Sequence, residues 1–303
     1  MNKLIILGGS GYVGRSIIDY LNSKKTQSRK IKKIIIYSRK GIKIEKKNKI
    51  EVVNFKKNLL KLKKLPEIEN IIYCINSNNL RYSNNCFKNF KYLLSKSSLK
   101  RKILFISSGA VYGPRKVRKK FSENETLTLN KINKFNDYKL KYALEKLFME
   151  NEFKKLGKSG YNVSIARCFT FYGRHILKYN YAISEIINTI VKKKKLNINN
   201  HKLTRSYMHG DDLSAWLLKI ITNSSKDCPI YNVGSDKPII LKDLMMELEK
   251  KYNNGFEIKK TKYLKSDFYV PSTKLAKKKL KLKITTDFKD AINLLISQKW
   301  KFL

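Results

Sequence analysis

The first half of the chain alternates short apolar runs with longer segments of helical periodicity. The short runs are continuously apolar, as in Ile34 to Ile36, which is typical of strands buried on both faces of a parallel sheet. Strands are predicted over residues 3–7, 33–38, 50–54, 71–75, 103–107 and 162–167. Helices are predicted over residues 12–21, 86–97 and 137–156, the last with Asn136 as its N-cap. This alternation predicts an α/β fold with helices on both faces of the sheet.

The second half of the chain breaks this regular alternation. Its predicted helices cover residues 181–193, 212–221, 241–252 and 288–298, and its short strands cover 196–198, 205–208 and 230–233. We find no internal repeat and no Gly/Ser-rich linker between the halves. We therefore predict a larger sheet domain over residues 1–167 and a smaller lobe over residues 168–303, with short segments of the lobe returning to the sheet.

The composition argues against several classes of protein. A hydrophobic fraction of 42% over 303 residues provides a sizeable core, so the chain is not expected to be disordered. No apolar run approaches the ~18 residues that span a bilayer, and the run over residues 4–7 ends at glycines without a signal cleavage site. The four cysteines are far apart and the three histidines form no ligand cluster. We therefore expect a cytoplasmic protein with reduced thiols, no metal site and no membrane partner.

The chain is strongly basic. It has 67 lysine and arginine residues against 23 acidic ones, a formal net charge of +44 at pH 7. Such an excess is typical of proteins that neutralise nucleic-acid phosphates. Here, however, the lysines are spread over the whole chain together with asparagine and isoleucine, as a compositional bias of the genome would produce. The pattern favours a lysine-rich surface over a nucleic-acid site.

A glycine-rich turn lies between the first predicted strand and the first predicted helix. Gly8 permits a tight turn, Gly11 allows a pyrophosphate to approach the backbone, and Gly14 lets helix and strand pack closely. The free amides and the dipole of the helix N-terminus would then bind the anion. The candidate cofactor-binding residues of this turn are Gly8, Ser10, Gly11, Tyr12, Val13 and Gly14. The motif predicts a Rossmann-like, doubly wound parallel sheet that binds a dinucleotide.

The end of the second strand bears on the choice of dinucleotide. An NAD site carries Asp or Glu there to bind the ribose hydroxyls, but this strand is followed by Ser38, Arg39 and Lys40. These three residues are candidates for binding a 2′-phosphate. The sequence therefore favours NADP, with NAD as the alternative.

Four further motifs follow in order along the chain. They are ISSGAVYGP at 106–114, ARCFTFYG at 166–173, RSYMHGDDL at 205–213 and YNVGS at 231–235. With the glycine turn, they resemble the extended short-chain dehydrogenase/reductase family, in its nucleotide-sugar epimerase/dehydratase branch, over nearly the whole chain. The resemblance implies an NAD(P)-dependent enzyme with a smaller C-terminal substrate-binding lobe, and family members often form homodimers.

The resemblance implies catalytic roles for a serine, a tyrosine and a lysine. Ser108 matches the serine that hydrogen-bonds the reacting sugar oxygen. The family's tyrosine and lysine normally lie four residues apart on the helix that follows this strand. There the lysine ammonium lowers the pKa of the tyrosine, which moves the proton while a hydride passes between the sugar carbon and the nicotinamide.

Two tyrosine–lysine pairs compete for this role. Tyr138 and Lys141 lie three residues apart, whereas Tyr142 and Lys146 have the usual spacing of four. Residues three apart still share a helix face. Because Asn136 caps the helix and the family's tyrosine lies in the first turn, we favour Tyr138 with Lys141. Tyr142 with Lys146 remains the alternative pair.

The resemblance also bears on the reaction and the substrate. Gly109 and Ala110 stand where related 4,6-dehydratases carry Asp-Glu, so epimerisation and ketoreduction remain. Arg205 matches the arginine that binds the diphosphate of the nucleotide sugar. Ketoreduction at C4 of a nucleoside-diphosphate sugar is favoured over 4-epimerisation, because NADP is usually released after each turnover. The alternative is a non-catalytic dinucleotide- or RNA-binding protein on the same fold.

Overall fold

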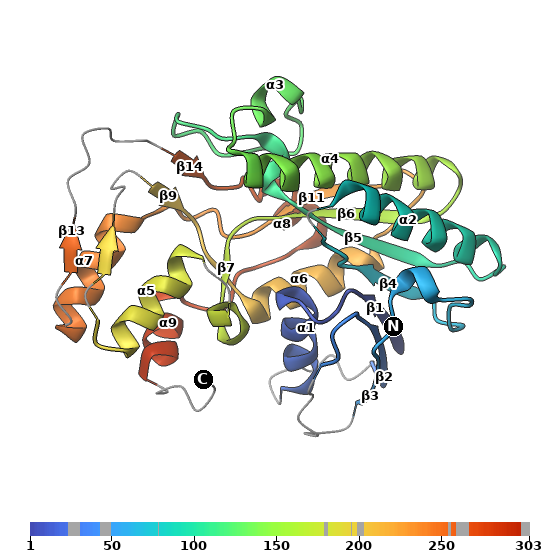
Figure 1. The fold of residues 1–303 in the computed structure, drawn as a ribbon, viewed down its shortest axis with the longest axis horizontal. Coiled ribbons are helices and arrows are strands. Elements are labelled where there is room, and N and C mark those ends of the chain that lie inside the picture. The colour runs from blue at the N-terminus through green and yellow to red at the C-terminus, as the bar shows by residue number, and fades with distance from the viewer. Residues whose placement is uncertain are drawn as a thin grey trace. The chain divides into compact units, whose positions relative to one another are not determined.

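The largest sheet among the described residues has seven strands (Figure 1). The computed structural model describes residues 1–23, 31–42, 50–77, 79–178, 181–194, 196–198, 203–253, 256–258 and 267–297. The strand order is β11-β6-β5-β4-β1-β2-β3, and the pairs from β6 to β3 are parallel. The chain winds outward from β1 in both directions, so the strand order reverses between β1 and β4. In such sheets ligands bind beyond the carboxyl ends of the strands at this reversal.

The elements of the sheet follow the apolar runs of the sequence. The strands are β1 (Lys3–Leu7), β2 (Lys33–Tyr37), β3 (Glu51–Phe55), β4 (Asn70–Tyr73), β5 (Lys102–Ser108), β6 (Asn162–Cys168) and β11 (Ile230–Val233). The helices that accompany them are α1 (Tyr12–Asn22), α2 (Leu80–Ser95), α3 (Leu129–Ile132), α4 (Asp137–Lys158) and α6 (Gly210–Thr222). Each of the six strands predicted in the first half is present, with its ends shifted by at most two residues. The predicted parallel α/β sheet is confirmed.

Helices α2 and α4 cover one face of the sheet and α1 covers the other (Figure 1). The core under α2 and α4 is aromatic: the Phe153 ring of α4 stacks on Phe105 of β5 at 4.5 Å and meets Tyr73 of β4 edge-on at 5.2 Å. Phe87 of α2 contacts the same Phe153 ring at 4.9 Å. This shared cluster joins α2 and α4 to the strands that they cover.

Helix α2 begins earlier than its predicted start at residue 86. Asn79 caps it, with its side-chain oxygen accepting from the Tyr82 amide at 2.9 Å. The first turns contain mostly polar residues, so the apolar periodicity that predicted the helix begins only at Cys86. The added turns place Tyr82 and Ser83 on α2, the helix that covers this face of the sheet.

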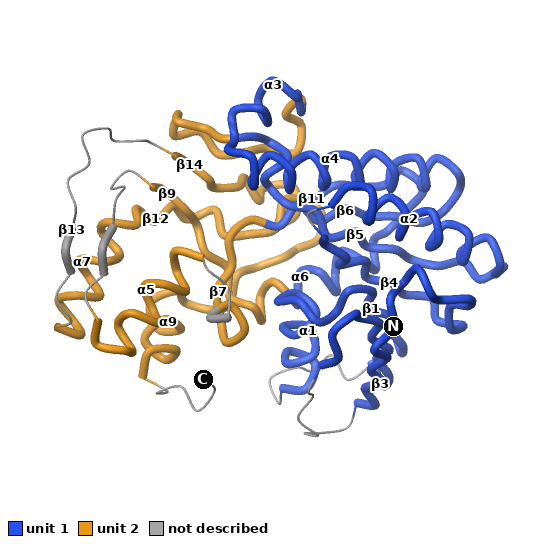
Figure 2. The backbone as a smooth tube through the Cα atoms, in the orientation of Figure 1, with its two compact units in different colours: residues 1–113, 127–168, 214–231 blue, residues 114–126, 169–213, 232–303 orange. Residues whose placement is uncertain are grey.

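The chain divides into two compact units (Figure 2). Unit 1 contains residues 1–113, 127–168 and 214–231, and unit 2 contains residues 114–126, 169–213 and 232–303. The sequence predicted a boundary after residue 167, with short segments of the lobe returning to the sheet. Residues 214–231 are such a segment of the sheet unit, where Ser224 Oγ lies 2.8 Å from Ser164 Oγ and donates to the Ile103 carbonyl at 3.2 Å.

Unit 2 contains shorter elements. They are β7 (Phe171–Tyr172), α5 (Ala182–Val191), β8 (Leu196–Ile198), β9 (Leu203–Arg205), β10 (Met208–His209), β12 (Ile239–Ile240), α7 (Leu241–Tyr252), β13 (Phe256–Ile258), β14 (Asp267–Tyr269), α8 (Lys274–Leu280) and α9 (Phe288–Ser297). The prediction of one strand over residues 205–208 is wrong, because the chain changes sheets there. β9 pairs with β12 and β14, whereas β10 pairs with β7. The predicted helices of this half are present, and the lysine-rich α8 was not predicted.

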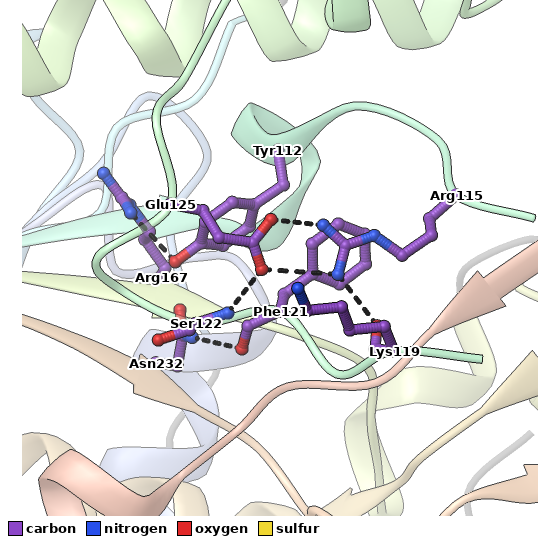
Figure 3. Close-up of polar contacts among 8 residues, drawn as sticks. All are labelled: Tyr112, Arg115, Lys119, Phe121, Ser122, Glu125, Arg167 and Asn232. Atoms are coloured by element: carbon purple, nitrogen blue, oxygen red, sulfur yellow. Dashed lines mark hydrogen bonds and ion pairs between the residues drawn. The ribbon is translucent and has the colours of Figure 1, made fainter. Parts of the chain in front are cut away.

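The segment 114–126 folds onto other parts of unit 2. The Phe121 amide donates to the Val270 carbonyl at 3.0 Å, and the Asn232 amide group donates to the Phe121 carbonyl at 3.0 Å. Arg115 lies over the Phe121 ring at 3.9 Å and forms a two-pronged ion pair with Glu125 (Figure 3). These contacts hold the segment in one conformation within its unit.

Candidate active site

The glycine turn has the geometry that a dinucleotide site requires. Gly8 has a positive φ of +82°, and a Cβ there would lie 2.8 Å from the Ile75 backbone nitrogen. A Cβ at Gly14 would lie 2.2 Å from the Gly9 carbonyl oxygen, so only glycine lets the helix approach the turn. At Gly11, by contrast, a Cβ would meet nothing within 4 Å among the described residues. A side chain at Gly11 would therefore occupy space that is open to a ligand.

The N-terminus of α1 is suited to binding an anion. Gly11 is its N-cap residue, and no side chain of the described structure caps it or places a carboxylate in its first turn. Arg15 Nε donates to the Ser10 carbonyl at 3.0 Å, which holds the turn. Tyr12 is buried and Val13 half-buried, so both support the turn from inside. The helix dipole and the first backbone amides remain directed at the space beside Gly11.

The three residues after β2 take different positions. The Ser38 hydroxyl is buried and donates to the Lys40 carbonyl at 2.7 Å, which shapes the loop. Arg39 and Lys40 are exposed. The Arg39 guanidinium lies over the Tyr82 ring at 5.0 Å, and the Tyr82 hydroxyl donates to Asn58 at 2.8 Å. The structure therefore gives Arg39 an aromatic support that the strand end alone did not reveal.

Ser108 lies at the carboxyl end of β5. Its side-chain oxygen accepts from the Ala110 amide at 3.2 Å and caps the short turn Gly109–Tyr112. Two residues earlier on the same strand, the Ile106 carbonyl accepts a hydrogen bond from Lys146 Nζ of α4 at 3.3 Å. Lys146 is thereby brought to the part of β5 that leads into Ser108.

Helix α4 carries both candidate tyrosine–lysine pairs. Tyr138 is 69% exposed, and Lys141 is exposed as well. Tyr142 is half-buried and Lys146 is only 3% exposed, with its Nζ 5.7 Å from the centroid of the Tyr142 ring. The structure thus brings Lys146, with the Tyr142 ring next to it, to β5, whereas the side chains of Tyr138 and Lys141 are exposed.

The surroundings of Lys146 affect its charge. Burial lowers the pKa of its ammonium, while Glu145, Cys74, Cys168 and Glu150 act in the opposite direction. Burial also raises the pKa of the Cys74 thiol, and it raises that of Cys168 to about 12. The two thiols are therefore neutral at pH 7, and the carboxylates are the groups that can balance the ammonium charge.

A buried ion pair supports the turn that follows Ser108. Arg167 of β6 and Glu150 of α4 are 2% and 0% exposed, and their Nη2 and Oε2 atoms lie 2.8 Å apart. Ser107 donates to Glu150 Oε1 at 2.6 Å. Figure 3 shows the other end of the network, where Arg167 Nη1 donates to the Tyr112 hydroxyl at 2.9 Å. Although burial opposes its charge, the bonds to Glu150 raise the pKa of Arg167. This network, which the sequence did not predict, joins α4, β5, β6 and the turn.

Arg205 lies in unit 2, at the end of β9. It forms an ion pair with Asp267 of β14, with Nη2 and Oδ2 2.6 Å apart, and donates to the Thr204 and Asp267 carbonyls at 2.9 and 3.1 Å. Its guanidinium lies 5.8 Å from the centroid of the Tyr269 ring. Arg205 is therefore a well-supported cation whose charge is already paired.

Comparison with known proteins identifies relatives of this fold. The NAD dependent epimerase/dehydratase family matches residues 4–234. A search of curated proteins found no match. Within the described residues, none of the helices combines the length and the apolar character needed to cross a membrane.

Several solved structures have the same fold over their whole length. MoeE5 in complex with UDP-glucose and NAD is 14% identical, with a TM-score of 0.78 and 98% of each chain covered. A UDP-glucose 4-epimerase is 16% identical, with a TM-score of 0.77 and 99% of each chain covered. The dTDP-glucose 4,6-dehydratase of Bacillus anthracis str. Ames, in complex with NAD, is 14% identical, with a TM-score of 0.74, and covers 99% of this chain and 97% of its own. At these identities the likeness shows the fold.

The order of the strands, the glycine turn and the helix that follows β5 all lie within the matched residues. The match spans well over half of the chain, and the predicted resemblance is confirmed at this level. The chain belongs to the NAD dependent epimerase/dehydratase family.

Proposed function

We propose that this protein is an NADP-linked oxidoreductase that reduces the C4 ketone of a nucleoside-diphosphate sugar, with 4-epimerisation as the alternative reaction. The observation that carries the proposal is the buried Lys146, which hydrogen-bonds the strand of Ser108 and lies next to the Tyr142 ring. A buried ammonium beside a tyrosine is expensive for stability, and such arrangements are concentrated at functional sites. We assign Ser108, Tyr142 and Lys146 as the catalytic residues, in place of the pair Tyr138–Lys141.

In this mechanism the chain's own residues control one proton. The positive charge of Lys146 favours the ionised form of Tyr142, so the tyrosine can donate its proton to the sugar oxygen and recover it later. The Ser108 hydroxyl hydrogen-bonds the same oxygen and orients it. When bound, the nicotinamide supplies the hydride that adds to the sugar carbon. The network of Arg167 and Glu150 keeps the turn after Ser108 in place.

The residues after Ser108 favour reduction or epimerisation over elimination of water. Gly109 and Ala110 provide no side-chain acid or base at the position where related dehydratases carry two carboxylates. Loss of water from a sugar needs such a group to remove one proton and to protonate the leaving hydroxyl. Transfer of a hydride and one proton at C4 needs only the serine, the tyrosine and the lysine.

The open space at Gly11 and the uncapped N-terminus of α1 support diphosphate binding by this turn. Arg39 supports the choice of NADP. It is exposed and stacked on Tyr82, so its guanidinium can bind a 2′-phosphate without first being ordered. Lys40 adds a second positive charge next to it. NAD binding, as in the neighbouring structures, is the alternative outcome.

For the substrate, we assign Arg205 to the diphosphate of the nucleotide sugar. Its fork of donors suits that anion, and the stack on Tyr269 keeps it in place. Asp267 occupies the guanidinium in the structure, so binding of a diphosphate would replace or share this ion pair.

The test is a panel of NADPH and NADH with nucleoside-diphosphate sugars and their 4-keto derivatives. We expect consumption of NADPH with a 4-keto substrate. The fall in absorbance of the reduced nicotinamide measures it. Formation of a C4 epimer from the sugar nucleotide without added reductant would indicate the epimerase instead. Salt-dependent RNA binding without turnover of any sugar nucleotide would contradict both and support the non-catalytic alternative.

Cofactor selection is tested with Arg39→Ala. Loss of a charge-assisted hydrogen bond costs about 1.5–3 kcal/mol, so the preference for NADPH over NADH should fall about ten- to hundredfold. Arg81→Ala is the matched control, because Arg81 is an exposed arginine of α2 near Tyr82 in sequence. An equal loss of affinity for both cofactors in Arg39→Ala would contradict a role in binding the 2′-phosphate.

A further inference from the structure

Glu145 of α4 is a buried carboxylate that the proposed mechanism does not use. It lies directly before Lys146 in the sequence and is 1% exposed. Its Oε1 atom accepts a hydrogen bond from Ser83 Oγ at 2.8 Å, whereas Oε2 has no hydrogen-bond partner among the described residues. Burial of a polar atom without a partner is costly, so such an atom calls for a physical explanation.

A chain of hydroxyls from α2 holds this carboxylate. Ser83 is 2% exposed, and its Oγ lies 2.8 Å from Ser77 Oγ in the loop that follows β4. Ser77 Oγ in turn accepts from the Asn79 amide at 3.2 Å, which leaves its own proton for Ser83. The position of Glu145 is therefore set from a second helix and from the loop, not only by its own backbone.

The other titratable groups around Glu145 are neutral at pH 7. They are Tyr73 of β4, whose hydroxyl is also buried without a partner in the described structure, and Cys86 of α2. Burial raises the pKa of both groups. Neither of them can balance a carboxylate charge, and the nearby positive charge on α4 is the ammonium of Lys146.

The groups that face Lys146 lead to the same pairing. The thiols of Cys74, directly after β4, and Cys168 of β6 are neutral, and the Ile106 carbonyl of β5 provides a single hydrogen bond. The second carboxylate, Glu150, is already bonded to Arg167 through both of its oxygens and to Ser107. Glu145 is thus the nearby carboxylate whose charge is not yet balanced by an arginine.

We propose that Glu145 is a positioning residue that supplies the countercharge for Lys146 and that Ser83 holds it in the required orientation. The two side chains act through charge rather than through a direct hydrogen bond. The role of Lys146 in turnover rests on the proposed function, but the charge coupling between Glu145 and Lys146 does not.

The primary test follows the titration of Lys146 in the full-length protein labelled with ¹³C-lysine. The Lys146 ¹³Cε resonance is assigned by its absence in Lys146→Arg. A neighbouring opposite charge favours the charged form of an ammonium, so Glu145→Gln should lower the pKa of Lys146, with an expected shift of about one unit. Glu152→Gln removes the same charge from a half-exposed position of α4 and should leave the titration unchanged. Equal titration in Glu145→Gln and the wild type would overturn the proposal.

A milder variant keeps the proposal testable if Glu145→Gln does not fold. Ser83→Ala removes the hydroxyl that orients Glu145, and we expect a smaller shift of the Lys146 titration in the same direction. The control is Ser95→Ala, because the Ser95 hydroxyl of α2 is exposed and donates to the Tyr92 carbonyl of its own helix. If Ser83→Ala and Ser95→Ala titrate alike, the orienting role of Ser83 is wrong.

Turnover provides a second, separable measurement. With an active substrate, the pH at which the rate falls at the alkaline end should move down in Glu145→Gln by the same amount as the Lys146 titration. A shifted titration without turnover on any sugar nucleotide would contradict the proposed function and leave the charge coupling intact. Turnover of a sugar nucleotide with an unshifted Lys146 titration would support the proposed function and contradict the charge coupling.

Discussion

The first turn of α4 and the two turns that follow it contain the same residue types in different environments. Tyr138 and Lys141 face solvent, whereas Tyr142 is half-buried and Lys146 is buried against β5. Tyr138, Tyr142 and Lys146 follow one another at intervals of four residues, so they lie along nearly one stripe of the helix. The difference between them is their height along the helix axis.

This difference in position along the axis explains why the start of the helix at Asn136 favoured Tyr138 with Lys141 in the sequence analysis. Lys146 is level with Ile106, which accepts its hydrogen bond. Tyr138 lies eight residues earlier, about 12 Å further along the axis at a rise of 1.5 Å per residue. Helix α4 therefore begins about one turn before Tyr142 and more than two turns before Lys146. The N-cap at Asn136 shows where the helix starts, but the position of a catalytic side chain depends on which turn lies against the strand.

The largest expected effect separates the two tyrosines. Tyr142→Phe removes the hydroxyl that transfers the proton, so kcat should fall about 10²- to 10⁴-fold, the usual contribution of a general acid or base. Tyr138→Phe should leave kcat within a factor of two, because its side chain is 69% exposed and lies one turn before Tyr142. Steady-state rates of both variants with the substrate found in the panel provide the measurement.

The reverse result would break the comparison. If Tyr138→Phe were the inactive variant, the first turn of α4 would carry the chemistry. Near-ultraviolet and far-ultraviolet circular dichroism of both variants excludes unfolding as the cause. Wild-type activity in both variants would mean that neither tyrosine transfers the proton.

The second effect compares two carboxylates of the same helix. Glu150→Gln leaves the buried guanidinium of Arg167 without its countercharge, and loss of one partner of a buried ion pair costs about 3–5 kcal/mol. Glu152→Gln breaks an ion pair with Lys155 whose lysine is mostly exposed, and such pairs contribute about 0–1 kcal/mol. Urea unfolding at equilibrium measures both.

A similar loss in the two variants would contradict a special role for the buried network. A smaller loss in the double variant Glu150→Gln, Arg167→Met than in Glu150→Gln alone would support it, because the uncompensated charge is then absent. The comparison thus measures how much the contacts between α4 and the sheet contribute to the free energy of unfolding.

Local patterns made most of the sheet predictable. Continuous Ile, Val and Leu runs gave β1 to β6 within two residues at each end, because parallel strands are buried on both faces. The glycine turn was predictable for the same reason: its requirements at Gly8 and Gly14 arise from atoms that lie close in the sequence or on the next strands. The split of residues 205–208 between two sheets was not predictable, since the strands that divide it come from residues 171–172, 239–240 and 267–269.

The missed parts of the candidate site depend on distant partners. Glu145 meets Ser83, and Arg205 meets Asp267, across 62 residues of sequence in each case. No spacing rule within one helix or strand reports such contacts. The sequence nevertheless carried one signal for Glu145, which stands directly before Lys146 of the Tyr142–Lys146 pair. If that lysine is buried, its neighbour is close to the core, where a carboxylate is unexpected.

The smallest effect isolates the first turn of α4 itself. The Asn136 side chain accepts from the Lys139 amide at 3.3 Å, and loss of an N-cap costs about 1 kcal/mol. Asn136→Ala should therefore lower the free energy of unfolding by about that amount, while kcat and KM stay unchanged, because the turn that frays lies before Tyr142. Asn136→Asp is the matched control, since aspartate keeps the acceptor and places a negative charge at the positive end of the helix dipole. If kcat fell in Asn136→Ala but not in Asn136→Asp, the first turn of α4 would take part in the site. The first turn and the turns that carry Tyr142 and Lys146 would then differ only in the size of their contribution to turnover.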